Sequence, residues 1–230
     1  MHELMTSQPF WLTLKVSAIS LVLQFVVGLP LGLYLAKNKT IVAKLTEIGV
    51  TLLMIFPPMA LGFFLILVFG KNGVIGEFLF SLFDFKIIFS FWGVLIAVFV
   101  VGLPFMVKSV QLARRQLSPS IVEAAQTLGK GRFSILTRVI LPNMKTGIVT
   151  GLLLAFGRSL GEVGIRLMLG GNIIGSTETL SLAIYNAVFE GNFTLATKLS
   201  VLLSVLALSV IVLLNITSRQ GIFTVFALRK

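Results

Sequence analysis

The sequence predicts an all-α integral membrane protein with about five transmembrane helices, its N-terminus outside and its C-terminus in the cytoplasm. Apolar residues make up 57% of the 230 residues, and charged residues make up 12%, about half of the roughly 25% found in soluble domains. A soluble fold cannot hide so many apolar side chains from water. The apolar residues also gather in runs long enough to cross a bilayer, and Lys and Arg gather in alternate connecting segments.

The apolar runs place the predicted helices. A span needs about 20 apolar residues to cross roughly 30 Å of hydrocarbon. Five runs meet this length and define one transmembrane domain over residues 10–216: residues 10–36, 48–69, 87–107, 146–169 and 199–216. Pro57 and Pro58 should disturb the second span, because proline removes a helical hydrogen bond. Residues 74–85 and 180–188 are apolar but too short to span, so they predict interfacial or re-entrant helices.

The basic residues set the orientation. Thirteen of the 19 Lys and Arg residues lie after the first span, after the third span or in the C-terminal tail. Cytoplasmic segments of membrane proteins collect such residues. The net charge of +11 therefore reports the topology of a multi-pass protein in a lipid bilayer, and no nucleic acid partner is expected.

The composition also excludes several kinds of chemistry. Cys is absent and the only His is His2, so thiolate chemistry and intramembrane metal sites built from Cys or His are excluded. Glu162 is the only acidic residue clearly within a span, which leaves no pair of acids and no buried base to activate a Ser. We therefore predict no catalytic residue and no metal site.

The long segment after the third span predicts a helix–Gly–helix hairpin. Ser118 suits the N-cap of the first helix, and Gly129 suits its C-terminal end. Apolar residues at helical spacing form one stripe on this helix: Ile121, Ala125 and Leu128. The second helix should carry three more on one side: Phe133, Leu136 and Ile140. Such an amphipathic, basic hairpin can lie in a groove of a partner protein, or it can rest on lipid headgroups.

Seven positions of this hairpin, here called the 118–142 hairpin, resemble the EAA loop of ABC importer permeases: Glu123, Ala124, Ala125, Gly129, Val139, Leu141 and Pro142. Only Val139 departs from the pattern, in which Ile is usual. The resemblance implies that the hairpin is the coupling helix that docks into a separate ATPase subunit, and that these seven residues form the coupling site.

The rest of the chain, from about residue 10 to residue 216, resembles the molybdate permease family. The segments that carry the likeness are 56–58, 103–107, 155–164 and 169–173. Sulfate and tungstate permeases share the stretch from Arg158 to Glu162 and the sequence Gly170-Gly171-Asn172. Two departures stand out: Ile165-Arg166 lies where small or uncharged residues are expected, and Ile174 lies where Pro is usual.

This resemblance implies a MetI-like permease core in the bacterial inner membrane. The implied protein is the membrane-spanning subunit of an ATP-driven, binding-protein-dependent importer for an oxyanion, with molybdate favoured and tungstate or sulfate as alternatives. Its implied partners are a second copy of itself, an ATPase subunit dimer and a periplasmic oxyanion-binding protein. Since the chain lacks a Gly-x4-Gly-Lys-Ser/Thr phosphate loop, it should bind no cofactor, and ATP should be used by the partner.

Charges within the fourth span are the candidates for a translocation path. Arg158, Glu162 and Arg166 recur at i, i+4 and i+8, which predicts one stripe on a helix, with Gly161 beside it. Either Arg158 presents a positive field to a passing dianion, or Arg158 and Glu162 merely pair and hold helices together. Pro57 and Pro58 are further candidates for the path or for a helix interface.

Two other classes of protein compete with the importer. A self-sufficient channel or secondary transporter would need ionisable residues in several spans for ion coupling, and apart from Lys15 only the fourth span has any. An intramembrane enzyme would need the catalytic groups that the composition lacks. Dependence of uptake on internal ATP separates the importer from the channel or carrier.

Overall fold

The computed structural model describes residues 8–217, and over that range every regular element is a helix. Three helices are long and apolar enough to cross a membrane: α2 (Gln8–Lys37), α6 (Phe91–Gln116) and α13 (Phe193–Thr217). Two bent helix pairs raise the number to five if each pair counts as one span, which agrees with the predicted number. His2 and the basic tail residues Arg219, Arg229 and Lys230 lie outside the described residues.

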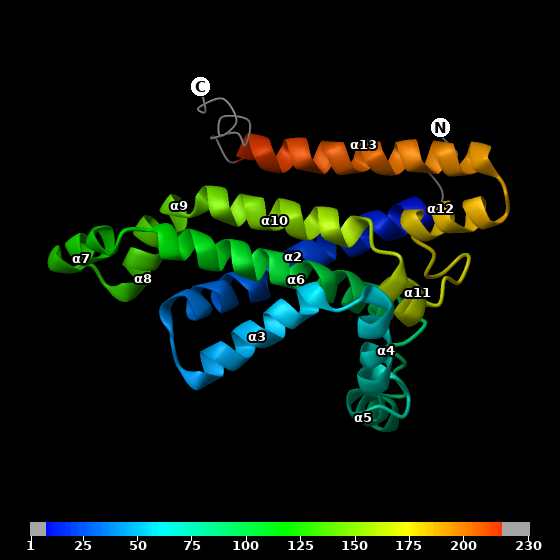
Figure 1. Cartoon of the computed structure of the whole chain (residues 1–230), viewed down its shortest axis with the longest axis horizontal. Helices are drawn as coiled ribbons and strands as arrows, with labels where there is room; N and C mark the ends of the chain where they lie inside the picture. Colours follow the sequence, from blue (N-terminus) through cyan, green and yellow to red (C-terminus); the bar gives the residue numbers. More distant parts are fainter. Residues whose placement is uncertain (1–7, 218–230) are drawn as a thin grey trace.

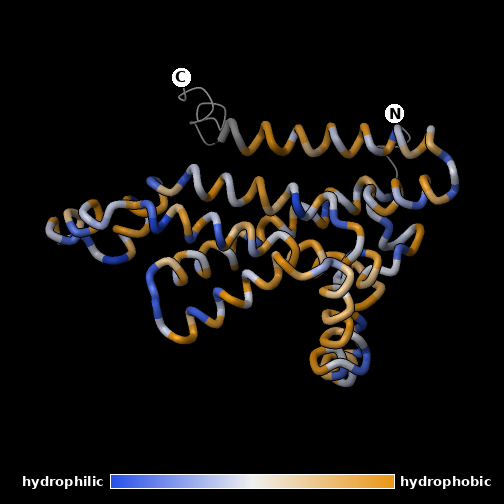
Figure 2. The backbone as a smooth tube through the Cα atoms, in the orientation of Figure 1, coloured by the Kyte–Doolittle hydropathy of each residue, from blue (hydrophilic) through white to orange (hydrophobic). Residues whose placement is uncertain are grey.

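The long helices run side by side, with α6 at the centre of the packing. Helix α6 lies against α2 and against α10 (Lys145–Leu160), and Figure 1 shows these three extending along the long axis of the molecule. Glycines allow the close approach of α2 to α6: a Cβ on Gly28 would lie 2.7 Å from Met106, and one on Gly32 would lie 2.7 Å from Val110. Figure 2 shows apolar residues along these helices and polar residues gathering at their ends.

A buried polar cluster joins α2, α6 and α10. The Gln24 side-chain amide donates hydrogen bonds to Ser20 Oγ at 2.9 Å and to the Val98 carbonyl at 3.1 Å. Ser159 of α10 donates to the same carbonyl at 2.9 Å. Gly102 packs directly against this cluster, and a Cβ at this position would collide with the Gln24 amide nitrogen.

We therefore expect Gly102→Leu to destabilise the protein by about 1–3 kcal/mol, the usual cost of forcing extra atoms into a packed core. The matched control is Gly49→Leu in α3 (Ile41–Ile55), because no atom lies within 4 Å of a Cβ at Gly49. Thermal unfolding in detergent measures both variants. Equal melting temperatures for the two would show that the cluster beneath Gly102 does not constrain the packing of the three helices.

The structure corrects the second predicted span, residues 48–69. The run divides at Phe56 and Pro57 into α3 and α4 (Pro58–Phe69), because the residue before a proline is pushed into extended backbone. Helix α4 instead joins α5 (Val74–Phe83) as a pair bent by 42°. Figure 1 shows α4 turning away from the long helices and running across their direction.

The fourth predicted span, residues 146–169, also divides. Helix α10 ends at Leu160, and the short helix α11 (Gly164–Gly170) follows after a break that contains Gly161. At its other end α10 bends by 67° from the preceding helical segment, Arg132–Asn143. The apolar segment predicted at residues 180–188 is α12 (Leu180–Phe189), which packs against α13.

Candidate functional site

The 118–142 hairpin lies at one end of the molecule. It consists of α7 (Pro119–Thr127), α8 (Arg132–Ile135), a π-helical turn over Leu136–Ile140 and α9 (Leu141–Asn143). Figure 1 shows it at the far end from α11 and α12. Helix α7 begins at Pro119, but the Ser118 hydroxyl bonds the Ser120 hydroxyl at 2.7 Å and does not cap the helix.

Gly129 ends the first helix of the hairpin by its backbone conformation. Its φ of +69° lies in the left-handed region, which side chains disfavour. The Gly129 N–H donates to the Gln126 carbonyl at 2.9 Å, and the Lys130 N–H donates to the Ala125 carbonyl at 3.2 Å. No atom lies within 4 Å of the place where a Cβ would be. Glycine is therefore required here by the backbone and not by the lack of space.

The hairpin presents apolar side chains outward. Leu128 is 76% exposed and Phe133 is 78% exposed, and Ile121 is also exposed. The predicted stripe on α7 is only partly right, because Ala125 is buried beneath the hairpin while its two partners point away. The other positions of the EAA pattern divide in the same way: Val139 and Leu141 are half-buried, and four are exposed, namely Glu123, Ala124, Gly129 and Pro142.

Arg158 and Glu162 form an ion pair beside the break between α10 and α11. The distance from Arg158 Nη1 to Glu162 Oε2 is 2.6 Å, and the Glu162 side chain is only 4% exposed. The other Glu162 oxygen, Oε1, accepts the Ile165 N–H at 3.2 Å. The Glu162 carboxylate therefore connects the Arg158 side chain to the start of α11. The Arg158 side chain remains half-exposed.

Arg166 is not part of this group, so the predicted stripe of three charges is wrong. Because α10 ends at Leu160, Arg166 lies on α11, and it is 1% exposed. Its guanidinium donates to the Ser159 carbonyl at 2.6 Å and to the Ser181 hydroxyl at 2.7 Å. A cation at the carboxyl end of a helix donates hydrogen bonds to the last carbonyls of the helix and interacts favourably with the helix dipole. Arg166 thus ties the end of α10 to the start of α12.

Two of the five path candidates line a small cavity. Arg158 and Pro58 both line it, and its volume is about 10 Å³, which is room for about one water molecule. Pro57 is not among its lining residues. Gly161 is exposed on the same helix end, with no atom within 4 Å of a Cβ placed there. The structure thus brings Arg158 together with Glu162 through their ion pair and with Pro58 through this cavity, which is itself too small to hold an oxyanion.

A charged group near the hairpin was missed from the sequence. Lys108 Nζ donates to Glu47 Oε1 at 3.1 Å, and Arg115 lies 3.6 Å from the other carboxylate oxygen. Partial burial alone raises the pKa of Glu47, but the hydrogen bond and charge of Lys108 and the charge of Arg115 outweigh it and lower the pKa below its usual value. Glu47 and Lys108 are 61 positions apart in the sequence, so no local pattern signals this contact.

Known proteins resemble this chain in sequence and in fold. Residues 28–229 match the family described as binding-protein-dependent transport system inner membrane component. The chain is 34% identical over 188 residues to a putative molybdenum transport system permease protein of Bacillus subtilis, covering 82% of this chain and 83% of that protein. It is 31% identical over 211 residues to a sulfate transport system permease protein of Salmonella typhimurium, covering 92% and 75% of the two chains.

Among solved structures, the fold matches a chain of the MetNI methionine ABC transporter in an inward-facing conformation. The TM-score is 0.68 at 21% sequence identity, and the match covers 92% of this chain and 94% of that one. At this identity the likeness establishes the fold, a MetI-like arrangement of helices, as predicted.

Proposed function

The chain belongs to the family of binding-protein-dependent transport system inner membrane components and is a permease subunit of an ABC importer; from this premise we propose that its cargo is an oxyanion, with molybdate preferred. The observation that carries the proposal is the similarity to permeases named for molybdenum and for sulfate. Molybdate and sulfate are both tetrahedral dianions, so one path chemistry suits both.

Coupling to ATP is assigned to the 118–142 hairpin. Leu128 and Phe133 are large apolar side chains exposed beside basic residues, and a partner groove that covers them gains their burial. The occupant of this surface is a separate ATPase subunit, in line with the EAA pattern from Glu123 to Pro142. The fixed turn at Gly129 holds the two parts of the hairpin in one orientation and allows it to transmit movement as a unit.

Arg158 is assigned to the translocation path. The Arg158 side chain is 39% exposed. No atom lies within 4 Å of a Cβ on the nearby Gly161, so a neighbouring helix or the passing anion can approach there. The paired Glu162 offsets most of the positive charge of Arg158. A passing dianion is therefore attracted less strongly than it would be by an unpaired arginine, and weaker attraction favours passage over tight binding.

The remaining partners follow from the family and from the size of the chain. Up to five candidate spans are few for enclosing a gated path, so two copies of the chain form it together. The family description names dependence on a binding protein. In this proposal that protein carries the oxyanion and delivers it on the side away from the hairpin. The chain itself has no catalytic role, and ATP is hydrolysed by the partner subunit.

We expect Arg158→Gln to lower molybdate uptake by about tenfold, which corresponds to roughly 1.4 kcal/mol of lost stabilisation of the passing anion. The matched control, Arg158→Lys, keeps the charge and should retain most of the uptake. Both variants are measured in proteoliposomes after the assembly with the ATPase has been checked. Uptake by the Gln variant at the parental rate, with the assembly intact, would remove Arg158 from the path.

Competition tests the substrate. Labelled molybdate is presented to the reconstituted transporter and its binding protein, with excess unlabelled molybdate, tungstate or sulfate. The proposal expects molybdate to compete best and sulfate least. Inhibition by sulfate at a lower concentration than is needed of unlabelled molybdate would assign the chain to sulfate instead.

A further inference from the structure

A second cavity lies far from the 118–142 hairpin, between the bent pair α4–α5 and the segment that leads into α6. Its volume is about 280 Å³, close to the lower end of the roughly 300–1,000 Å³ typical of small-ligand sites. Of its 11 lining residues, seven carry Ile or Phe side chains, two are glycines and two are Lys71 and Lys86. Neither the EAA pattern nor the path candidates belong to it.

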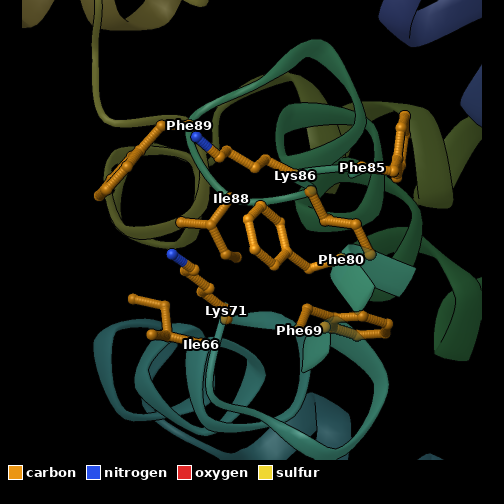
Figure 3. Close-up of a pocket in the computed structure, with 11 residues that line it drawn as sticks. Ile66, Phe69, Lys71, Phe80, Phe85, Lys86, Ile88 and Phe89 are labelled. Atoms are coloured by element: carbon orange, nitrogen blue, oxygen red, sulfur yellow. The ribbon is translucent and has the colours of Figure 1, made fainter. Parts of the chain in front are cut away.

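The two lysines converge on one aromatic ring. Lys71 Nζ lies 4.4 Å from the centre of the Phe80 ring, and Lys86 Nζ lies 5.7 Å from it. Figure 3 shows both ammonium groups at the same side of the pocket, with Ile88 between them in this view. The ring attracts both cations and holds their chains in place. The pocket therefore has a positive rim and an apolar interior.

This positive charge is not neutralised by the protein. Within residues 8–217, neither Lys71 nor Lys86 forms an ion pair, although Glu77 and Asp84 lie between them in the sequence. Both lysines are exposed. Two unpaired cations at the mouth of an apolar cavity are complementary to a ligand with an anionic head and a hydrocarbon tail.

The surroundings decide between ligands of this kind. Exposed apolar side chains of α5, among them Phe78 at 60% and Phe83 at 71%, make the surface around the pocket apolar, and such a surface suits the hydrocarbon of a bilayer. A small hydrophilic anion would gain nothing from the Phe and Ile walls. We propose that the pocket binds an anionic phospholipid, with its phosphate between Lys71 and Lys86 and part of an acyl chain against Phe80 and Phe85.

Trp92 provides a reporter for this site. Its ring lies 6.0 Å from the ring of Phe85, which lines the pocket, and Trp11 is the only other tryptophan in the chain. In a Trp11→Phe background, the full-length permease is assembled with its ATPase and reconstituted in bilayers of phosphatidylcholine. Phosphatidylglycerol or further phosphatidylcholine, brominated on its acyl chains, is then titrated in, and the quenching of Trp92 is recorded.

Two lysines near a membrane surface give about a tenfold or greater preference for an anionic lipid. Half-maximal quenching should therefore need about tenfold less brominated phosphatidylglycerol than phosphatidylcholine. The preference should disappear in Lys71→Met/Lys86→Met, which keeps the apolar stems, and should persist in Lys71→Arg/Lys86→Arg. The control pair Lys15→Met/Lys198→Met removes two exposed lysines of α2 and α13 and should leave the preference unchanged.

Four results would overturn the proposal. Equal quenching by the two lipids in the parent, or a preference that survives the Met pair, would show that the lysines do not select the headgroup. Relief of the quenching by excess molybdate would identify a site for free anions. Absence of quenching by either lipid would show that another protein surface covers the pocket. None of these results depends on transport, so the test stands apart from that of the proposed function.

Discussion

Arg166→Met is expected to lower the free energy of unfolding by about 3 kcal/mol, the largest stability loss from a single substitution considered for this chain. For a domain of this size, such a loss lowers the melting temperature by roughly 6–12 °C. Methionine fills much of the same volume but donates no hydrogen bond. The Ser159 carbonyl and the hydroxyls of Thr179 and Ser181 then lose a buried donor, and the end of α10 is no longer tied to α12.

The same substitution at an exposed arginine is the control. Arg138 is exposed in the 118–142 hairpin, so Arg138→Met should leave the melting temperature within about 2 °C, as surface charges contribute little. Arg166→Lys keeps the charge but not the planar fork of donors, and it should fall between the two. If Arg166→Met unfolds at the same temperature as Arg138→Met, the connection between α10 and α12 does not depend on Arg166.

Gly129→Val is expected to reduce ATP-driven uptake by at least about tenfold while lowering the melting temperature by no more than about 8 °C. A valine at φ +69° is strained by about 1–2 kcal/mol, and the hairpin can relieve that strain only by changing the turn. Because α8 follows the turn directly, the exposed Phe133 would then change its orientation relative to the exposed Leu128. The ATPase would lose the orientation of its docking surface.

Asparagine separates backbone conformation from bulk at this position. Asn enters the left-handed region far more readily than Val, and no atom within 4 Å of a Cβ opposes it. Gly129→Asn should therefore retain uptake to within about twofold of the parent. Uptake and ATP hydrolysis are measured together in the reconstituted complex. Loss of uptake in the Asn variant equal to that in the Val variant would mean that the partner contacts this position directly.

The sequence predicted the features that depend on composition and on local backbone preference. The apolar runs of α2, α6 and α13 are long and contain at most one charged residue, Lys15 in α2, so hydropathy alone finds them. Gly129 ends its helix as expected, since the left-handed conformation there is a local property of the chain. The short helices α5 and α12 were also indicated, because their apolar segments are too short to span.

The breaks within apolar runs could not be placed by hydropathy, which measures polarity and not continuity. By hydropathy, residues 48–69 form one continuous span, but the structure divides them into α3 and α4 at Pro57 and Pro58. The two prolines were the sequence signal for this break. Likewise, Gly161 and Gly164 on either side of Glu162 could have indicated that the helix ends before Arg166. A helical spacing of charges has no meaning across such a break.

Other features depend on contacts between distant residues. The hydroxyl partners of Arg166 lie 13 and 15 residues further along the chain, on the other side of a loop. The predicted apolar stripe on α7 was wrong at Ala125, which is buried while Ile121 and Leu128 are exposed. Which side of a short helix is buried depends on the elements that pack against that helix. The lysines of the α4–α5 pocket carry no motif, and only the fold places both beside Phe80.

The central claim, that this chain imports its cargo only when a partner hydrolyses ATP, is tested most directly by uptake into proteoliposomes. The permease is reconstituted with its ATPase subunits, the binding protein and labelled molybdate are supplied outside, and the vesicles are loaded with ATP or left without it. We predict uptake only with internal ATP and almost none in Gly129→Val. Uptake at the same rate with and without ATP would contradict the importer and would make the chain a channel or a secondary carrier.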